Sequence, residues 1–367
     1  MIALSSEIAL ILTFIGSFLV TYLSIPSIVN VARNKKIFDD PSHRKSHVKQ
    51  TPTLGGIAIF AGFTIAAGSL IDYGFVSSMQ YVIVACIVMF FIGIKDDIQI
   101  IAPHKKLLGQ IFAALILIIP GNLYFSSLHG FLGIYNISVI SSLLLTLFVI
   151  IVIINSFNLI DGIDGLAAST GMLATAFFGL WFYISGNVEY SLISAAMFGS
   201  LLAFFRFNVS DGKYKIFMGD TGSLIVGLIV AVQVILFNEK NIGFTSAFPV
   251  KSAPAVSFAI LIFPLYDTIR VFIIRMSRGR SPFAADKNHL HHCILKLGFS
   301  HVQSTLLIVA VNIAFIAIAL LLQNFIIKSG IVWIMAITLC IATLISIFIE
   351  RSVRKNGTHE KEKPEKF

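Results

Sequence analysis

Long apolar blocks alternate with short polar stretches along the chain as far as about residue 350. Most blocks approach the ~20 residues that a helix needs to cross a ~30 Å hydrocarbon core. The pattern predicts an all-α, polytopic integral membrane protein with about eleven transmembrane helices in one domain, residues 1–350. We place them at 8–31, 54–71, 79–94, 107–120, 137–154, 166–184, 190–206, 222–237, 255–275, 304–326 and 331–349. The blocks at 79–94 and 107–120 are short and leave room for tilted, broken or re-entrant helices.

The composition agrees with this pattern. Of the 367 residues, 57% are hydrophobic and only 12% are charged, against roughly 25% charged residues in soluble domains. A soluble fold with one apolar anchor is thereby excluded. Residues 351–367 mix Lys and Glu with Gly and Pro and cannot bury a core, so we expect a disordered cytoplasmic tail there.

Basic residues are distributed unevenly between the loops. If alternate loops are assigned to the cytoplasm, that side collects Arg33, Lys35, Lys36, Arg44, Lys45, Lys49, Lys95, Lys105, Lys106, Lys213, Lys215, Arg278, Arg280 and Lys287. The other side holds mainly Lys240, Lys251 and Lys328. The positive-inside rule then predicts the N-terminus outside and the C-terminus in the cytoplasm. The formal charge of +9 reflects this bias and contact with anionic membrane lipid, and nucleic acid is not an expected partner.

Carboxylates fall mainly in the same cytoplasmic loops, close to the helix ends. An ionisable side chain at the bilayer centre costs ~2.5–3.5 kcal/mol, so a membrane chain keeps acids where they have a partner or a function. One interpretation is solvated charge that balances the basic loops, which we favour for Asp211. Asp96 and Asp97 directly follow an apolar block, and adjacent like charges repel unless a cation or a phosphate-bound metal lies between them. This pair predicts a metal-binding or catalytic role.

A second polar cluster repeats at every third position: Asn155, Asn158, Asp161 and Asp164. On an unbroken helix the first and last of these side chains would lie about 180° apart. Gly162 and Gly165 allow a break that lets them converge on a polar ligand at the membrane edge. The alternative is an ordinary turn between helices, but such turns seldom contain two Asn and two Asp. We interpret the run as functional.

Three further elements each allow two interpretations. Asp220, in the segment 218–223, is either the N-cap of the next helix or a ligand of Mg²⁺, because both roles use the same oxygens. Asp267 and Arg270 lie one turn apart within an apolar block and form either a structural ion pair or part of an active site. The loop 278–292 carries three His with Arg and Lys, which suits phosphate better than zinc because no Cys or carboxylate set accompanies them.

The first inner loop, residues 40–56, combines cations such as Lys49 with a Gly pair at 55–56. A positive-inside anchor explains the charges but not the Thr-Pro-Thr-x-Gly-Gly segment. The Gly pair indicates a close approach of two backbones.

Taken in order, these motifs resemble those of a known family. Asp-Asp at 96–97, Asn-x-x-Asn-x-x-Asp-Gly-x-Asp-Gly-Leu at 155–166 and Gly-Asp-x-Gly-Ser at 219–223 resemble the cytoplasmic signatures of the polyprenyl-phosphate N-acetylhexosamine-1-phosphate transferases. The likeness covers about residues 39–299. His-Leu-His-His at 289–292 is similar to the GlcNAc-1-phosphate transferases of the WecA and TagO types. The related MraY translocase carries three consecutive His followed by Phe-Glu, a motif that this chain lacks.

The resemblance implies a function. An N-acetylhexosamine-1-phosphate, most directly GlcNAc-1-phosphate, passes from its UDP-sugar to undecaprenyl phosphate with release of UMP. The implied cofactor is Mg²⁺, with Mn²⁺ as an alternative. The reaction would initiate a cell-surface polysaccharide of the O-antigen, common antigen or teichoic acid type, at the cytoplasmic face of a bacterial membrane. Two alternatives to this function remain: the same chemistry with UDP-MurNAc-pentapeptide as donor, and a secondary transporter, for which midplane sites would be expected. A homodimer also remains open.

The resemblance also implies roles for individual residues. The implied metal ligands are Asn158 and Asp220. The implied catalytic residues are Asp96, Asp97, Asp161 and His289, of which Asp96 and Asp97 bind or deprotonate the lipid phosphate. The implied substrate contacts are Lys49, Lys106, Asn155, Asp164, Arg280, His291 and His292, with Asp164 reading the uracil. We favour direct attack of the lipid phosphate on the sugar-linked phosphorus, and an aspartyl-phosphate intermediate on Asp97 is the rival.

Overall fold

The structure is a computed structural model that describes residues 5–35, 37, 51–70, 79–244, 248–279, 289–323 and 330–361. Within these residues the chain forms thirteen α-helices, a short 3-10 helix and one two-stranded sheet. The helices are α1 (Ser6–Asn34), α2 (Gly55–Leu70), α3 (Met79–Ile98), α4 (Pro103–Ile118), α5 (Val139–Ile160), α6 (Leu166–Ile184), α7 (Val188–Asn208), α8 (Gly219–Lys240), α9 (Ala253–Ile260), α10 (Ile262–Ser277), α11 (Leu290–Lys296), α12 (His301–Leu322) and α13 (Gly330–Lys361). The 3-10 helix η1 spans Ile242–Phe244. The helical class expected from the sequence is confirmed.

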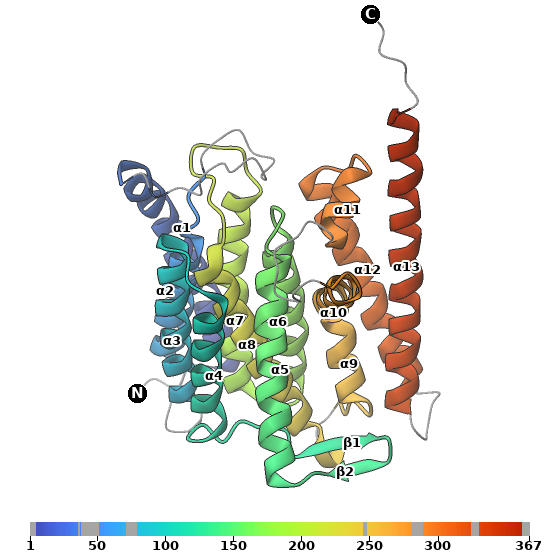
Figure 1. Cartoon of the computed structure of the whole chain (residues 1–367). Coiled ribbons are helices and arrows are strands. Elements are labelled where there is room, and N and C mark those ends of the chain that lie inside the picture. Colours follow the sequence, from blue (N-terminus) through green and yellow to red (C-terminus); the bar gives the residue numbers. More distant parts are fainter. Residues whose placement is uncertain are drawn as a thin grey trace, which may run out of the picture.

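The longer helices stand side by side, with α9 to α13 on one side of α5 and α6 (Figure 1). The helices α9 to α13 contact α5 and α6 directly: α5 packs on α10, and α6 packs on α12. An antiparallel hairpin, β1 (Ser127–Phe131) and β2 (Ile134–Asn136), lies at the opposite end of the bundle from α11 (Figure 1). Its turn residues Leu132 and Gly133 have φ of 52° and 81°, the left-handed conformation that two-residue hairpin turns use.

Helices lie at all eleven positions predicted from the sequence, but they differ in length. Within the described residues, seven are long and apolar enough to cross a membrane: Ser6–Asn34, Val139–Ile160, Leu166–Ile184, Val188–Asn208, Gly219–Lys240, His301–Leu322 and Ile331–Val353. The pair α9 and α10, bent by 75°, makes an eighth if it is one broken span. By contrast, α2 and α4 have only 16 residues each, fewer than the ~20 of a full crossing. The chain is a polytopic membrane protein, with fewer full-length spans than the sequence suggested.

The most deeply buried helix of the bundle is α8, with 94% of its most apolar window inside the protein. Two close approaches position its first turn. A Cβ on Gly56 of α2 would lie 2.1 Å from the backbone N of Gly222, and a Cβ on Gly93 of α3 would lie 2.4 Å from the Cα of Thr221. Glycine at positions 56 and 93 therefore allows α2 and α3 to reach the start of α8.

The segment before α2 also runs alongside the start of α8. The Phe217 N–H donates to the Pro52 carbonyl at 2.8 Å, and the N–H groups of Gly55 and Gly56 donate to the carbonyls of Phe217 and Met218, both at 2.9 Å. The close backbone approach predicted for the Gly pair is confirmed. The Thr-Pro-Thr-x-Gly-Gly segment thus supports the Gly-Asp segment at 219–220.

The C-terminal helix continues further than the sequence analysis expected. Residues 351–361, assigned there to a disordered tail, form the last turns of α13. The segment is rich in Arg, Lys and Glu, which are good helix formers, so a helix that is already nucleated can propagate through it. Residues 362–367 lie outside the described residues.

Candidate active site

Asp97, at the end of α3, caps the N-terminus of α8. Its Oδ1 accepts the Asp220 N–H at 2.7 Å, and its Oδ2 accepts the N–H and the hydroxyl of Thr221 at 3.0 and 2.6 Å. The first amides of a helix lack partners within the helix, and a carboxylate is a favoured partner for them. The capping role that the sequence analysis weighed for Asp220 therefore belongs to Asp97. The Asp220 carboxylate makes other contacts.

Those contacts form a compact cluster around the ammonium group of Lys106. The Lys106 Nζ lies 2.9 Å from Asp220 Oδ1, 3.1 Å from Asp96 Oδ2 and 3.2 Å from Asn158 Oδ1. The Asn158 amide also donates to Asp220, and at 2.9 Å to the Ser223 hydroxyl. Side chains from α3, α4, α5 and α8 thus meet at one point, as expected for a site built on several loops at one membrane face.

This oxygen set fits Mg²⁺, which prefers carboxylate and amide oxygens and shares its coordination shell with substrate phosphates. Asp220 and Asn158 would hold the ion, and the Lys106 ammonium already shows that their oxygens favour a cation. Among the described residues, no three His, Cys, Asp or Glu side chains converge into a closed metal site. A magnesium ion here would therefore complete its shell with water and phosphate.

The helix break predicted within the Asn/Asp run lies at residues 161–165, between α5 and α6. Gly165 has a φ of +80°, which only glycine adopts readily, and its N–H donates to Asn208 Oδ1 at 2.6 Å. Asp161 is partly buried beside this break. Burial raises the pKa of Asp161 well above its ordinary value, and the charges of Asp220, Asp97 and Asp164 raise it further. The break therefore gathers strong negative potential, which suits a site for cations.

Asp164 is held by residues that the sequence analysis did not assign to the site. Its carboxylate lies 2.8 Å from Lys215 Nζ and 3.5 Å from His301 Nδ1, and its N–H donates to the same His301 atom at 3.3 Å. Burial lowers the pKa of Lys215, but the hydrogen bonds and charges of Asp164 and Asp211 outweigh it and raise that pKa overall. Lys215 had appeared only as an inner-loop charge, and nothing in its local sequence singles it out.

Asn155 differs from the other members of its run. It exchanges two hydrogen bonds with Gln110 of α4, at 3.2 and 2.7 Å, and also donates to the Ile151 carbonyl at 2.8 Å. These contacts attach α5 to α4 next to Lys106. In this structure Asn155 positions the helix that carries Asn158, while its predicted contact with substrate stays a prediction.

The histidine loop, residues 289–292, is anchored by Asp267 of α10. Its Oδ2 lies 2.9 Å from His289 Nδ1, and its Oδ1 accepts the Leu290 N–H at 2.9 Å. Arg270 is 3.6 Å from the same carboxylate, so the structural ion pair is present, while a role of Asp267 in the active site stays a prediction. With Nδ1–H donated to Asp267, the His289 Nε2 is the nitrogen that can accept a proton or a hydrogen bond.

His291 joins the histidine loop to the break between α5 and α6. Its Nε2 lies 2.5 Å from where a Cβ on Gly162 would stand, and its ring stacks on His289 with centroids 5.4 Å apart. Burial lowers the pKa of His291 to about 3, so this imidazole is neutral near pH 7. Any contact of His291 with phosphate is therefore made without a positive charge. The His292 ring lies 4.3 Å from that of His291.

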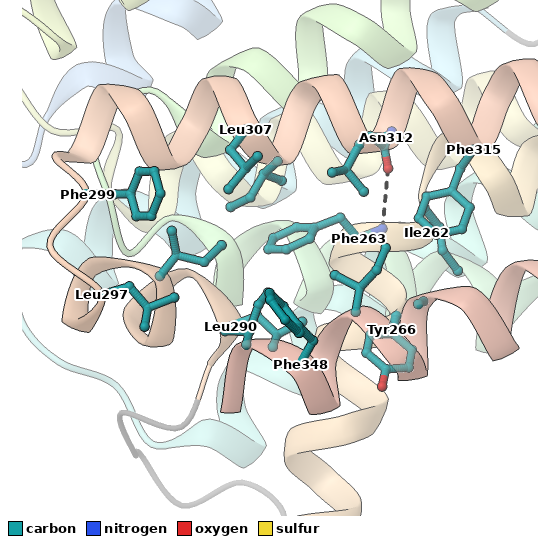
Figure 2. Close-up of a pocket in the computed structure, with 16 residues that line it drawn as sticks. Ile262, Phe263, Tyr266, Leu290, Leu297, Phe299, Leu307, Asn312, Phe315 and Phe348 are labelled. Atoms are coloured by element: carbon teal, nitrogen blue, oxygen red, sulfur yellow. Dashed lines mark hydrogen bonds between the residues drawn. The ribbon is translucent and has the colours of Figure 1, made fainter. Parts of the chain in front are cut away.

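An apolar cavity of about 290 Å³ lies behind the histidine loop, between α10, α11, α12 and α13 (Figure 2). Tyr266, Leu290, Phe315 and Phe348 are among its lining residues. The side chain of Asn312 also reaches it, but its amide already bonds to the Ile260 carbonyl at 2.6 Å and to the Phe263 N–H at 3.4 Å. The cavity walls offer contacts for hydrocarbon and not for a nucleotide.

Two predicted contacts of the donor, Lys49 and Arg280, lie outside the described residues and remain predictions. Apart from Asp97, which caps α8, and Asn155, which bonds to Gln110, the other predicted residues of the site gather into three neighbouring groups. These are the Lys106 cluster, the Asp161–Gly165 break with Lys215 and His301, and the histidine loop held by Asp267.

Comparisons with known proteins identify the family of this chain. Residues 79–238 match Glycosyl transferase family 4. The chain is 30% identical over 298 residues to the undecaprenyl-phosphate alpha-N-acetylglucosaminyl 1-phosphate transferase of Escherichia coli K12, covering 80% of this chain and 78% of that protein. The chain belongs to Glycosyl transferase family 4. Similarity also extends to the decaprenyl-phosphate N-acetylglucosaminephosphotransferases of Mycobacterium tuberculosis H37Rv, 32% identical over 312 residues with 79% and 76% coverage, and of Mycolicibacterium smegmatis, 33% identical over 290 residues with 73% and 71% coverage.

Membership of Glycosyl transferase family 4 makes the chain a membrane-bound glycosyl-1-phosphate transferase, which confirms the resemblance recognised in the motifs. The motifs at 96–97, 155–166 and 219–223 all fall within the residues that match the family. The acids and the amide of the Lys106 cluster come from these segments, and Lys106 itself lies within residues 79–238, so the matched region contains the candidate site for the metal and the phosphates.

Proposed function

We propose that this enzyme transfers GlcNAc-1-phosphate from UDP-GlcNAc to undecaprenyl phosphate and releases UMP. The names of its relatives describe N-acetylglucosamine phosphate transfer involving a polyprenyl phosphate. The observation that carries the proposal is the Lys106 ammonium, set among the oxygens of Asp96, Asp220 and Asn158 beside the capped start of α8. Such a group of cation and acids can hold two phosphate substrates and a magnesium ion at once. The product would begin a cell-surface polysaccharide.

The geometry supports a mechanism of positioning and charge neutralisation. Mg²⁺, held by Asp220 and Asn158, would offset the negative charge of the donor diphosphate. Lys106 adds a fixed positive charge, and Asp164, held by Lys215, reads the uracil. An oxygen of the lipid phosphate attacks the sugar-linked phosphorus, and the bond between that phosphorus and the oxygen of UMP breaks. UMP leaves with the electron pair, while the C1–O bond of the sugar stays intact.

The contacts of Asp97 support direct attack by the lipid phosphate. Both of its oxygens are engaged by the first turn of α8, in three hydrogen bonds. A carboxylate whose lone pairs are held in this way is a weak nucleophile and keeps its position. We therefore assign Asp97 to holding the start of α8 and shaping the acceptor site, with His289 acting on the donor from the other side of the site.

We also propose the orientation and the number of spans. Residues 1–350 form one transferase domain with about eleven spans, in which short helices such as α2 and α4 complete the bundle. Its N-terminus lies outside and its catalytic loops face the cytoplasm of a bacterium. A reporter fused after Phe367 or within 95–106 should be cytoplasmic, and one within 121–136 or 238–252 external, because of the Lys and Arg asymmetry. An external C-terminus would separate the site from the UDP-sugar pool and contradict the assignment.

A donor panel tests the reaction. Purified enzyme in detergent, with Mg²⁺ and undecaprenyl phosphate, is given UDP-GlcNAc, UDP-GalNAc or UDP-MurNAc-pentapeptide, and UMP release is measured. We expect the fastest release with UDP-GlcNAc. A transporter would leave all three donors intact, and fastest release from UDP-MurNAc-pentapeptide would show that the enzyme uses the same chemistry on a different sugar.

A further inference from the structure

Charged side chains connect the last helix of the chain to the histidine loop. Glu350 of α13 contacts Arg270 of α10, Arg270 lies beside Asp267, and Asp267 holds His289. We propose that Glu350 and Arg270 are positioning residues for His289, so that α13 completes the catalytic loop. This inference rests on the role given to His289 under the proposed function.

The contact between Glu350 and Arg270 orients the guanidinium of Arg270. Glu350 Oε1 accepts hydrogen bonds from Arg270 Nε, at 3.1 Å, and from Arg270 Nη2. The Arg270 side chain is only 9% exposed, whereas that of Glu350 is 32% exposed. A planar guanidinium with two N–H groups on one carboxylate cannot turn freely, so the direction of its remaining N–H groups is set. Glu350 thereby decides which way Arg270 presents its charge.

The contact between Arg270 and Asp267 brings the positive charge of Arg270 next to the carboxylate that holds His289. Arg270 Nη1 lies 3.6 Å from Oδ1 of Asp267, whose side chain is fully buried. A buried carboxylate needs a cation and hydrogen-bond donors around it. Asp267 finds these in Arg270, the Leu290 N–H and His289. A turned Arg270 would leave Asp267 free to shift, and the His289 ring would shift with it.

Apolar packing links the same elements through the residues of α13 that directly precede Glu350. Phe348 and Ile349 line the cavity of Figure 2 together with Leu290 and Ile294 of α11. Leu290 directly follows His289, so the wall of the cavity and the histidine share one backbone segment. A shift of α13 therefore affects His289 in two ways, through the charged contacts of Arg270 and through the apolar packing on Leu290.

The test compares kcat and KM for UDP-GlcNAc in full-length variants, in detergent with Mg²⁺ and undecaprenyl phosphate. Glu350→Gln should lower kcat by about tenfold or more and change KM by less than about twofold, because a neutral amide oxygen holds the guanidinium more weakly than a carboxylate does and a misplaced catalytic group costs rate more than donor affinity. The matched control is Glu239→Gln. Glu239 also accepts two hydrogen bonds from one residue, Ser126, but at the hairpin end of the bundle, and this variant should keep the wild-type kcat.

A charge-swapped variant, Arg270→Glu with Glu350→Arg, tests whether Arg270 and Glu350 position His289 or only connect α10 to α13. It retains an ion pair between α10 and α13 and so remains informative if E350Q does not fold. It also presents a carboxylate to Asp267, and we expect its kcat to be no higher than that of E350Q. Recovery of the wild-type kcat by the swap would overturn the proposal, as would a folded E350Q variant with unchanged kcat.

His289→Ala distinguishes failure of this inference from failure of the proposed function. Full UMP release by H289A would remove the catalytic role of His289 itself. Loss of release in H289A together with full activity in E350Q would leave that role in place and reject only the contribution of α13.

Discussion

Replacing Asp220 with Ala is expected to lower UMP release by roughly a hundredfold or more, because the lost carboxylate leaves the diphosphate charge uncompensated. The variant also removes the carboxylate that both Lys106 and Asn158 contact. UMP release and calorimetric binding of UDP-GlcNAc should be measured over a range of Mg²⁺ concentrations. We expect donor binding to lose its dependence on Mg²⁺.

The control for Asp220→Ala is Asp211→Ala. Asp211 is another acid outside the predicted spans, with its side chain 94% exposed, and it contacts Lys215 at 3.1 Å. Its removal should change UMP release by less than about threefold, since an exposed ion pair contributes little. Normal Mg²⁺ dependence in D220A would contradict the metal assignment and would leave the Asp220 carboxylate only its contacts with Lys106 and Asn158.

Asp97→Asn should lose about a hundredfold or more of activity while it still binds the donor. Asn keeps the size of the side chain but removes its charge, and its amide would meet the N–H groups of Asp220 and Thr221. In direct transfer, UMP release requires the lipid acceptor. We therefore expect no burst of UMP from UDP-GlcNAc and Mg²⁺ alone in the wild-type enzyme. A burst of about one UMP per site that disappears in D97N would make Asp97 the nucleophile and reject direct attack.

Thr221→Val removes one of the three hydrogen bonds by which Asp97 holds the start of α8. It removes the hydroxyl that donates to Asp97 Oδ2 at 2.6 Å but retains the carboxylate and the shape of the side chain. A lost hydrogen bond of this kind costs about 1 kcal/mol of stability. We expect T221V to unfold at a lower temperature yet to keep most of its activity. A loss as large as that of D97N would show that this one hydrogen bond limits turnover as much as the charge of Asp97 does.

Several features of this protein could be predicted from the sequence because they depend on neighbouring residues. Apolar blocks close to the thickness of a bilayer predict helices wherever they occur; ten of the eleven blocks contain one helix, and the block 255–275 contains two, α9 and α10. The break after Ile160 follows from Gly162 and Gly165. The order of the polar motifs was sufficient to recognise the family. The span count was less certain, because α2 and α4 are helices but have only 16 residues.

Tertiary packing decided which of the polar residues meet. Asp97 caps a helix that begins more than a hundred positions later, and this contact depends on the close approach of Gly93 to Thr221. The Asp220 carboxylate is available to a metal only because Asp97 takes the capping role, a choice that the local sequence left open. Likewise, His291 is neutral because the fold buries it, and Lys215 joins Asp164 only through the packing of distant loops. Local periodicity sets the helices and their polar ends, whereas the partners of each buried charge depend on distances between helices, which only the folded bundle sets.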